Sequence, residues 1–249
     1  MEAQDRRPLA RPALPLRALA DLLRALREVA QGDGTWERLL SEAQTKSDAV
    51  GEVEWVVSVD STVVRAHQHA SGARRKPSLG DEKGGVAHPP EEALGRGRGG
   101  LSTKLHLSCD GKGRPLSVVL TPGQRNDGTQ LEAVLDAIRV PRTGRGRPRK
   151  RPERLLADRG YGKGLYRRML RARGIPHTIP ERSDHRQRRA KRPGRPLGFE
   201  ADLYARRNVV ERCVNRLKQW RAIATRYEKR AVNYRAMVVI ASLMIWLTT

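Results

Sequence analysis

Residues 204–218 read YARRNVVERCVNRLK, and the rest of the chain is interpreted outward from this stretch. At 3.6 residues per turn, one helical face would carry Tyr204, Arg207, Glu211 and Lys218. A carboxylate flanked by a phenol and two cationic side chains suits a phosphate group, because cations bind phosphate oxygens and an acid can hold a metal. A surface helix with charge pairs four residues apart explains the same residues. The stretch alone leaves both interpretations open.

The charge balance indicates the kind of partner. The chain has 249 residues, with 50 Lys and Arg against 27 Asp and Glu, and a formal net charge of +23. So large a cationic excess favours binding to a polyanion, of which nucleic acid is the commonest. No basic amphipathic helix has aromatic residues on its apolar side, so a membrane surface is a weaker candidate.

The cysteines and the apolar segments indicate the compartment. Cys109 and Cys213 form no CxxC pair, which gives neither a zinc knuckle nor a disulfide framework and favours a reducing cytoplasm. The start of the chain lacks the apolar core of a signal peptide. The apolar run 236–247 is too short to span a bilayer, so we expect a buried helix there and no membrane partner.

The pattern of apolar residues predicts an α/β fold. Three β-rich runs come first, and the second and third are joined by a short glycine-containing connection typical of a hairpin. Helical and strand patterns then alternate, which predicts a mixed five-stranded sheet flanked by helices. Helices are expected at 14–31, in a segment that begins at Thr35, and from an N-cap at Asp127 to about residue 139. Further helices are expected in a basic amphipathic segment that ends near residue 173 and at 204–218. The strands are expected at 53–60, 101–110, 115–123, 154–158 and 176–180.

Composition divides the chain into two expected parts. Residues 1–50 would form a short helical N-terminal part, and 51–249 the main domain. Within the second part, 71–100 reads as a flexible insert rich in Gly, Pro and charge. Two further stretches, 142–154 and 182–198, read as basic loops, and the second should not fold by itself.

Three acids stand out within this pattern. Asp60 and Asp158 each end a predicted buried strand, where sheet meets solvent, and Glu211 lies on the helix after the last strand. Gathered together, they would repel one another unless a cation lay among them, and Mg²⁺ prefers oxygen ligands. Two alternatives remain open. Asp60 would also serve as a turn-capping residue, and Asp127 is a rival carboxylate whose role as a helix N-cap is stronger.

Three sequence blocks together resemble a known family. They are VSVDSTVVRAH (57–67), LLADRGY (155–161) and the spacing Y-x2-R-x3-E-x6-K from Tyr204 to Lys218. They resemble the signature blocks of bacterial insertion-sequence DDE transposases, in particular insertion-sequence family five within the family-four-like set. The segment 95–127 also resembles the region that this group carries between its first two acids. The resemblance covers about residues 34–247, and it implies that 1–50 is the remnant of a DNA-end-binding region and that 51–249 is a DDE catalytic domain.

The resemblance implies a fold, an activity and a set of site residues. It implies a ribonuclease-H-like core, similar to retroviral integrase, in which Asp60, Asp158 and Glu211 hold two Mg²⁺ ions, with Mn²⁺ as a substitute. It implies cleavage of a strand of double-stranded DNA and attack of the freed 3′-hydroxyl on target DNA. The protein would act as a homo-oligomer in the bacterial cytoplasm, associated with the nucleoid. Contacts to DNA would come from Tyr204, Arg207 and Lys218 at the transposon end and, along the backbone, from Arg149, Lys150, Arg151, Arg188, Arg189 and Lys191.

The N-terminus departs from this pattern. DGTWERLL (33–40) matches the group, whereas the Ala/Leu/Pro/Arg-biased residues 1–32 do not. A catalytically idle or truncated DNA-binding remnant is therefore the main alternative. A ribonuclease-H-like nuclease without strand transfer also fits the acids, but it gives no reason for the Tyr, Arg and Lys of the 204–218 helix.

Overall fold

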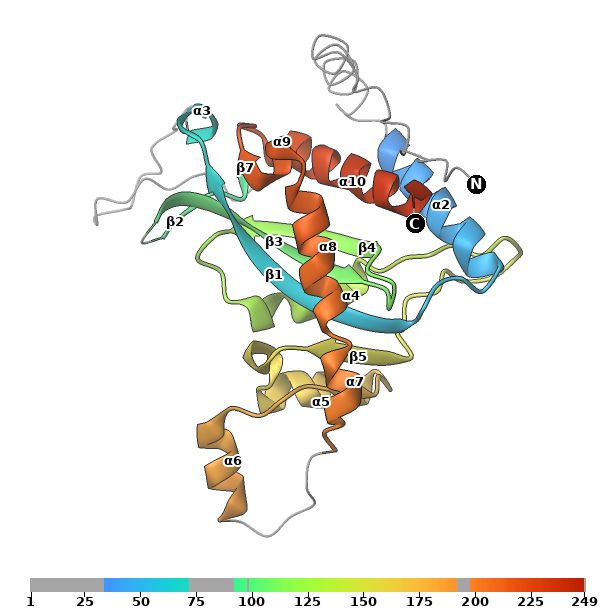
Figure 1. Cartoon of the computed structure of the whole chain (residues 1–249), viewed down its shortest axis with the longest axis vertical. Helices are drawn as coiled ribbons and strands as arrows, with labels where there is room; N and C mark the ends of the chain where they lie inside the picture. The colour runs from blue at the N-terminus through green and yellow to red at the C-terminus, as the bar shows by residue number, and fades with distance from the viewer. Residues whose placement is uncertain (1–33, 72–91, 98, 192–197, 249) are drawn as a thin grey trace, which may run out of the picture.

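A computed structural model describes residues 34–71, 92–97, 99–191 and 198–248 (Figure 1). The expected helix at 14–31 and most of the expected insert 71–100 lie outside these residues. The division at residue 50 stays a prediction.

A mixed sheet forms the centre of the molecule. Five strands run in the order β4-β3-β1-β5-β6, with β3 antiparallel to β1 and β4, and with β1, β5 and β6 parallel to one another. Two short strands, β2 and β7, pair with β3 and β1 and bring the sheet to seven strands. The strand bounds are β1 Val56–Ala66, β2 Gly95–Gly97, β3 Gly100–Cys109, β4 Pro115–Pro122, β5 Arg154–Ala157, β6 His177–Thr178 and β7 Thr225–Arg226.

The sheet confirms the predicted fold class. An antiparallel three-stranded half continues through β1 into a parallel half, which is the arrangement expected of a ribonuclease-H-like core. The five core strands are the five that the sequence predicts. Apolar alternation does not reveal β2 and β7, because their sequences, GRG and TR, contain no large apolar residue.

Helices cover both faces of the sheet. Figure 1 shows α8 crossing one face, with α4 and α5 on the other side of the sheet, while α2 and α10 lie next to each other. The helix bounds are α2 Thr35–Ala49, α3 Gln68–Ser71, α4 Leu131–Asp136, α5 Gly164–Ala172, α6 Ser183–Ala190, α7 Ala201–Ala205, α8 Asn208–Lys218, α9 Arg221–Ala224 and α10 Ala231–Thr248, with 3₁₀ turns η2 Asp127–Gln130 and η3 Arg159–Tyr161.

The alternation of side chains along β1 divides the core in two. Val57 and Val59 pack with Leu170 of α5 in one apolar cluster, and Val64 packs with Val210 of α8 in the other. Because successive strand residues point to opposite faces, Asp60 shares the face of Val64 and therefore lies under α8.

Several local predictions differ from the structure. Asp60 does not end its strand, since β1 continues for six residues to Ala66. Asn126 rather than Asp127 is the N-cap, and it caps the 3₁₀ turn η2 that leads into α4, because its side chain accepts from the Gly128 N–H. Thr35 is the first residue of α2, and Gly34 precedes it as N-cap.

The basic stretch 182–198 also differs from its prediction. Its first half forms α6, whereas the composition predicts a loop. Glu181 and Arg189 pair across this helix at 2.7 Å, a contact that net charge alone does not reveal.

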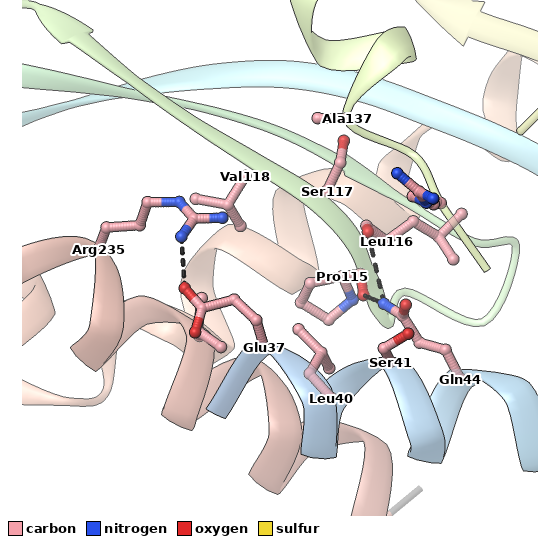
Figure 2. Close-up of a pocket in the computed structure, with 12 residues that line it drawn as sticks. Glu37, Leu40, Ser41, Gln44, Pro115, Leu116, Ser117, Val118, Ala137 and Arg235 are labelled. Atoms are coloured by element: carbon pink, nitrogen blue, oxygen red, sulfur yellow. Dashed lines mark hydrogen bonds and ion pairs between the residues drawn. The ribbon is translucent and has the colours of Figure 1, made fainter. Parts of the chain in front are cut away.

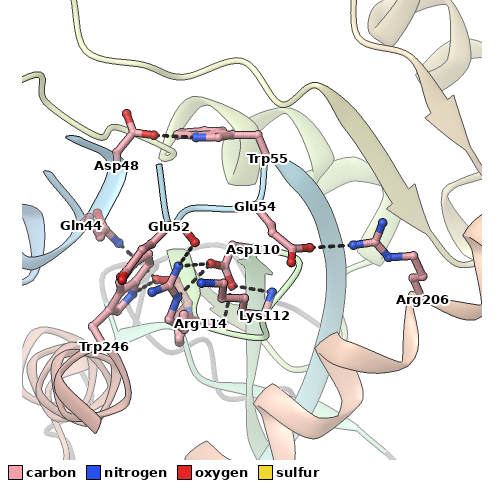
Figure 3. Close-up of polar contacts among 11 residues, drawn as sticks. Gln44, Asp48, Glu52, Glu54, Trp55, Asp110, Lys112, Arg114, Arg206 and Trp246 are labelled. Atoms are coloured by element: carbon pink, nitrogen blue, oxygen red, sulfur yellow. Dashed lines mark hydrogen bonds and ion pairs between the residues drawn. The ribbon is translucent and has the colours of Figure 1, made fainter. Parts of the chain in front are cut away.

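A buried ion pair ties the β3–β4 hairpin to its surroundings (Figure 3). Arg114 donates to Asp110 at 2.9 and 2.7 Å and to the Glu52 carbonyl at 2.8 Å. Its guanidinium also stacks 4.0 Å from the centre of the Trp246 ring. The predicted hairpin connection is confirmed, and Arg114 joins it to the segment before β1 and to α10.

The closing helix, α10, confirms the predicted apolar C-terminal helix. By length and composition alone it could cross a membrane, but 50% of it is buried inside the fold. That burial is what the core helix of a folded domain shows.

Candidate active site

Strand register brings the first two predicted acids together. Val59 of β1 is the parallel partner of Ala157 of β5, so the next residues, Asp60 and Asp158, are neighbours across the two strands. Adjacent strands lie about 4.8 Å apart, and residues in register point to the same face. The two carboxylates therefore share the α8 face of the sheet.

Arg207 links the third acid to this pair. Its guanidinium donates to Asp60 Oδ2 at 2.9 Å and to Glu211 Oε1 at 2.7 Å. The side chain of Arg207 is 13% exposed and that of Glu211 is 57% exposed. One cationic group thus joins a sheet carboxylate to a helix carboxylate.

The charges at this place perturb one another. Burial raises the pKa of Asp60, the Ser61 N–H and Arg207 oppose that rise, and the charges of Asp158 and Glu211 add to it. Desolvation lowers the pKa of Arg207, but its contacts with Glu211 and Asp60 outweigh this and raise it. For Asp60, the rise in pKa from burial and from the neighbouring acids therefore outweighs the lowering by the Ser61 N–H and Arg207.

The stretch 204–218 is interrupted rather than one continuous helix. Between α7 and α8 the N–H groups of Arg206 and Arg207 bond to carbonyls three residues back, at 3.2 and 2.9 Å. Tighter 3₁₀ turns of this kind rotate each residue further than an α-helix does. Arg206 pairs with Glu54 at 2.6 Å (Figure 3). The two neighbouring arginines therefore have separate carboxylate partners.

Tyr204 lies at the edge of the same group. Burial raises its pKa, with Arg207 opposing and with Asp158, Asp60 and Glu211 adding to the rise. Its ring lies 5.4 Å from that of Phe199, which is 46% exposed. Tyr204 thus lies within electrostatic reach of Arg207 and of the three acids, and the roles assigned to these residues stay a prediction. Phe199 lies outside the signature spacing, so the sequence did not single it out.

Lys218 lies farther away. It is seven residues after Glu211 on α8, which is about 10 Å along the helix axis at 1.5 Å per residue. It therefore extends the cationic surface from the carboxylates along α8.

Tyr161 is a further neighbour of the acids. It is 1% exposed, and its hydroxyl has no partner of hydrogen-bond geometry among the described residues. Burial raises its pKa, as do the charges of Asp127, Asp60 and Asp158, while the nearby Ser61 hydroxyl opposes the rise. The position of Tyr161 three residues after Asp158, in LLADRGY, is the signal that could have identified it.

Asp127 has an ion-pair partner of its own. Lys104 holds it in an ion pair at 2.9 Å and also donates to the Arg125 carbonyl at 2.7 Å. The structure thus gives Asp127 a partner outside the three-acid group, while the role of rival carboxylate stays a hypothesis.

The residues predicted to bind the DNA backbone differ in whether other groups of the protein already hold their side chains. Arg149 contacts Glu153 at 2.8 Å and Asp48 at 3.4 Å, and stacks 4.1 Å from the centre of the Trp55 ring. These contacts weigh against a role for Arg149 on DNA, as the Glu181 pair does for Arg189. Solvent-exposed positions are occupied by Lys150, Arg151, Arg188 and Lys191.

The donor set fits a divalent cation in its chemistry. Carboxylate oxygens are the ligands that hard cations prefer, and positive charge already lies between Asp60 and Glu211 in the form of Arg207. Within the described ranges, no three Asp, Glu, His or Cys side chains are close enough to hold an ion together. A metal would therefore need Arg207 to move aside.

Two other features lie apart from the carboxylates. His67 packs against His69 and Tyr227, with ring centres 4.5 and 4.8 Å away. A cavity of about 290 Å³ lies between α2, β4 and α10, with an ion pair between Glu37 and Arg235 at its edge (Figure 2). It contains none of the predicted site residues.

Comparisons with known proteins agree with the three sequence blocks that resemble DDE transposases. The family described as the transposase DDE domain matches residues 51–247. A Burkholderia cepacia protein named as a transposase for insertion sequence element IS402 is 37% identical over 144 residues, covering 57% of this chain and 62% of its own length. A Brucella ovis protein named as a transposase for element IS6501 is 29% identical over 151 residues, covering 59% of this chain and 99% of its own length.

A solved structure of the Mos1 strand transfer complex is 15% identical with a TM-score of 0.29, and the match covers 99% of this chain and 64% of that one. A score this low supports no conclusion here. The matches thus span less than two thirds of the Burkholderia protein and of Mos1. Because the family match covers most of the chain and contains all three acids, the chain belongs to the family of transposase DDE domains.

Proposed function

We propose that this chain catalyses metal-dependent cleavage of a DNA strand and transfer of the freed 3′-hydroxyl to target DNA, which together move an insertion sequence. The observation that carries the proposal is the grouping of Asp60 with Asp158 by strand register and with Glu211 through their shared partner, Arg207. The net charge of +23 supports double-stranded DNA, both element ends and target, as the partner.

Each site residue would have a distinct role in the reaction. Asp60 and Asp158, fixed by paired strands, would hold Mg²⁺ together with Glu211 of α8. When bound, the metal would neutralise charge at the scissile phosphate and activate the attacking water, and Mn²⁺ would substitute for Mg²⁺. Tyr204 and Arg207 would orient the phosphate next to the scissile bond, and Lys218 would bind the backbone farther along α8.

The assembly and the location follow from the reaction. Joining two element ends requires two active sites on one DNA complex, so we propose a homo-oligomer assembled on DNA. Association with the nucleoid of a bacterial cytoplasm would follow from the same DNA affinity.

An assay of strand transfer distinguishes this function from the alternative functions. The full chain is incubated with Mg²⁺, a target plasmid and a labelled duplex that carries the terminal repeat of its element, either intact or already cut to a 3′-hydroxyl. A transposase cuts the intact duplex and joins both duplexes to the plasmid. Cutting without joining would favour a nuclease, and binding without either would favour a DNA-binding remnant.

A further inference from the structure

Arg207 occupies the oxygens that a metal would need. The two oxygens of Asp60 are both engaged, Oδ1 by the Ser61 N–H at 2.8 Å and Oδ2 by Arg207 at 2.9 Å. The same guanidinium takes Glu211 Oε1 at 2.7 Å. Hydrogen bonds between ionised partners are stronger than neutral ones. A metal that binds these oxygens therefore has to replace strong contacts.

The backbone under Arg207 is suited to such a displacement. Arg207 precedes α8 at the 3₁₀ turn that joins it to α7, and 3₁₀ segments within helices often mark hinges. Its Nε is buried and has no hydrogen-bond partner among the described atoms, so its contact with the acids leaves one donor unsatisfied. A phosphate accepts bidentate bonds from a guanidinium and could satisfy it.

We propose that Arg207 is an internal counter-ion that competes with divalent metal for Asp60 and Glu211, and that a DNA phosphate draws it away. Metal and DNA then bind cooperatively: the DNA-free protein holds metal weakly, and phosphate contact releases the carboxylates. Reciprocity requires that metal tighten DNA binding by the same factor. The inference rests on the proposed function, because it takes the three acids as the metal site.

The first test measures metal alone. Mn²⁺ binding to the DNA-free full chain is followed by calorimetry and by the electron paramagnetic resonance signal of free Mn²⁺. Arg207→Gln should bind Mn²⁺ roughly tenfold tighter than wild type or more, because the competing charge-assisted bonds are gone. Arg206→Gln is the matched control, since it removes the neighbouring arginine and its exposed pair with Glu54, and its Mn²⁺ affinity should equal that of wild type.

A second variant guards against misfolding. Arg207→Lys keeps the charge but cannot form the two-pronged contact, so its Mn²⁺ affinity should fall between those of wild type and Arg207→Gln. Thermal unfolding followed by circular dichroism establishes that each variant is folded before titration.

The second test adds a short duplex, with Mn²⁺ bound by the duplex alone subtracted. DNA should tighten Mn²⁺ binding to wild type and have much less effect on Arg207→Gln. Equal Mn²⁺ affinities of wild type and Arg207→Gln without DNA would overturn the competition while leaving the metal site intact. Absence of bound Mn²⁺ in every variant would overturn the three-acid site, and with it the proposed function.

Discussion

Asp60 and Asp158 follow directly after Val59 and Ala157, which are register partners in the parallel pair of β1 and β5. Two acids that are 98 residues apart in sequence are thereby neighbours on one face of the sheet. Asp60 lies inside β1, whereas Asp158 comes immediately after β5 and caps η3 by accepting from the Gly160 N–H. A slip of one residue in this register would move one carboxylate to the opposite face.

Lys218 and Arg149 should differ in their effects on DNA binding. Lys218→Ala should reduce the slope of log affinity against log salt concentration by about 0.9, because one phosphate contact is lost. Arg149→Gln should leave that slope unchanged, since its guanidinium is held by Trp55, Asp48 and Glu153. Fluorescence anisotropy of a labelled duplex over a salt series measures both. A reduced slope for Arg149→Gln would return Arg149 to the DNA-binding set.

Gly113 supports the start of α8 and should not tolerate a side chain. It has a φ of +83°, and an added Cβ would lie 3.3 Å from the Val209 carbonyl oxygen. Gly51 is the matched control, with a φ of +74° and open space around it. Each change to Ala should cost about 1 kcal/mol in unfolding free energy from backbone strain, with a further loss at Gly113 alone. Urea unfolding measures the difference, and equal losses would show that the contact with α8 has no energetic weight.

The buried pair of Asp110 and Arg114 should be sensitive to removal of one partner. The two side chains are 0% and 2% exposed, so Arg114→Met leaves Asp110 buried without its counter-ion. We expect a loss of about 3–5 kcal/mol in unfolding free energy, with partial recovery in the double variant that adds Asp110→Asn.

An exposed pair provides the control for that measurement. Glu200 pairs with Arg154 at 2.6 Å but is 57% exposed, so Glu200→Gln should cost no more than about 1 kcal/mol. If Arg114→Met cost no more than this control, the buried network would not hold the hairpin to α10.

His106 should make stability depend on pH. Its ring is buried, its Nε2 lies 2.8 Å from Thr121 Oγ1, and desolvation lowers its pKa from 6.5 to about 4, with Asp127 opposing and Lys104 assisting. Between these values the unfolded state binds more protons, so stability is full above pH 6.5 and falls as pH drops toward 4. Relative to His106→Gln, wild type should lose roughly 3 kcal/mol over this window. Parallel pH profiles of the two proteins would contradict the assignment.

The sequence predicted β1, β3, β4 and β5 of the core sheet because these strands are long or strongly apolar. The β3–β4 hairpin, the short β5 and the apolar α10 have local sequence patterns that indicate their structure without reference to distant contacts. The three acids were also identifiable, since they lie in blocks that resemble a family. Their neighbourhood needed the parallel register of β1 and β5, which composition does not encode.

The remaining features depend on contacts between distant residues. The extension of β1 beyond Asp60 is stabilised by pairing with β3 as far as Arg65, a partner that no local pattern identifies. The break between α7 and α8 accompanies the separate pairing of Arg206 and Arg207 with Glu54 and Asp60. The buried Tyr161 hydroxyl becomes notable only once η3 places it near the acids.

The measurement that tests the central claim most directly is strand cleavage in Mg²⁺ of a labelled duplex bearing the element's terminal repeat. Wild type is compared with Asp60→Asn, Asp158→Asn and Glu211→Gln at concentrations that give equal DNA occupancy. The account predicts that wild type releases a 3′-hydroxyl strand and that each variant binds the duplex but releases none. Cleavage at the wild-type rate by any one of the three variants would contradict it.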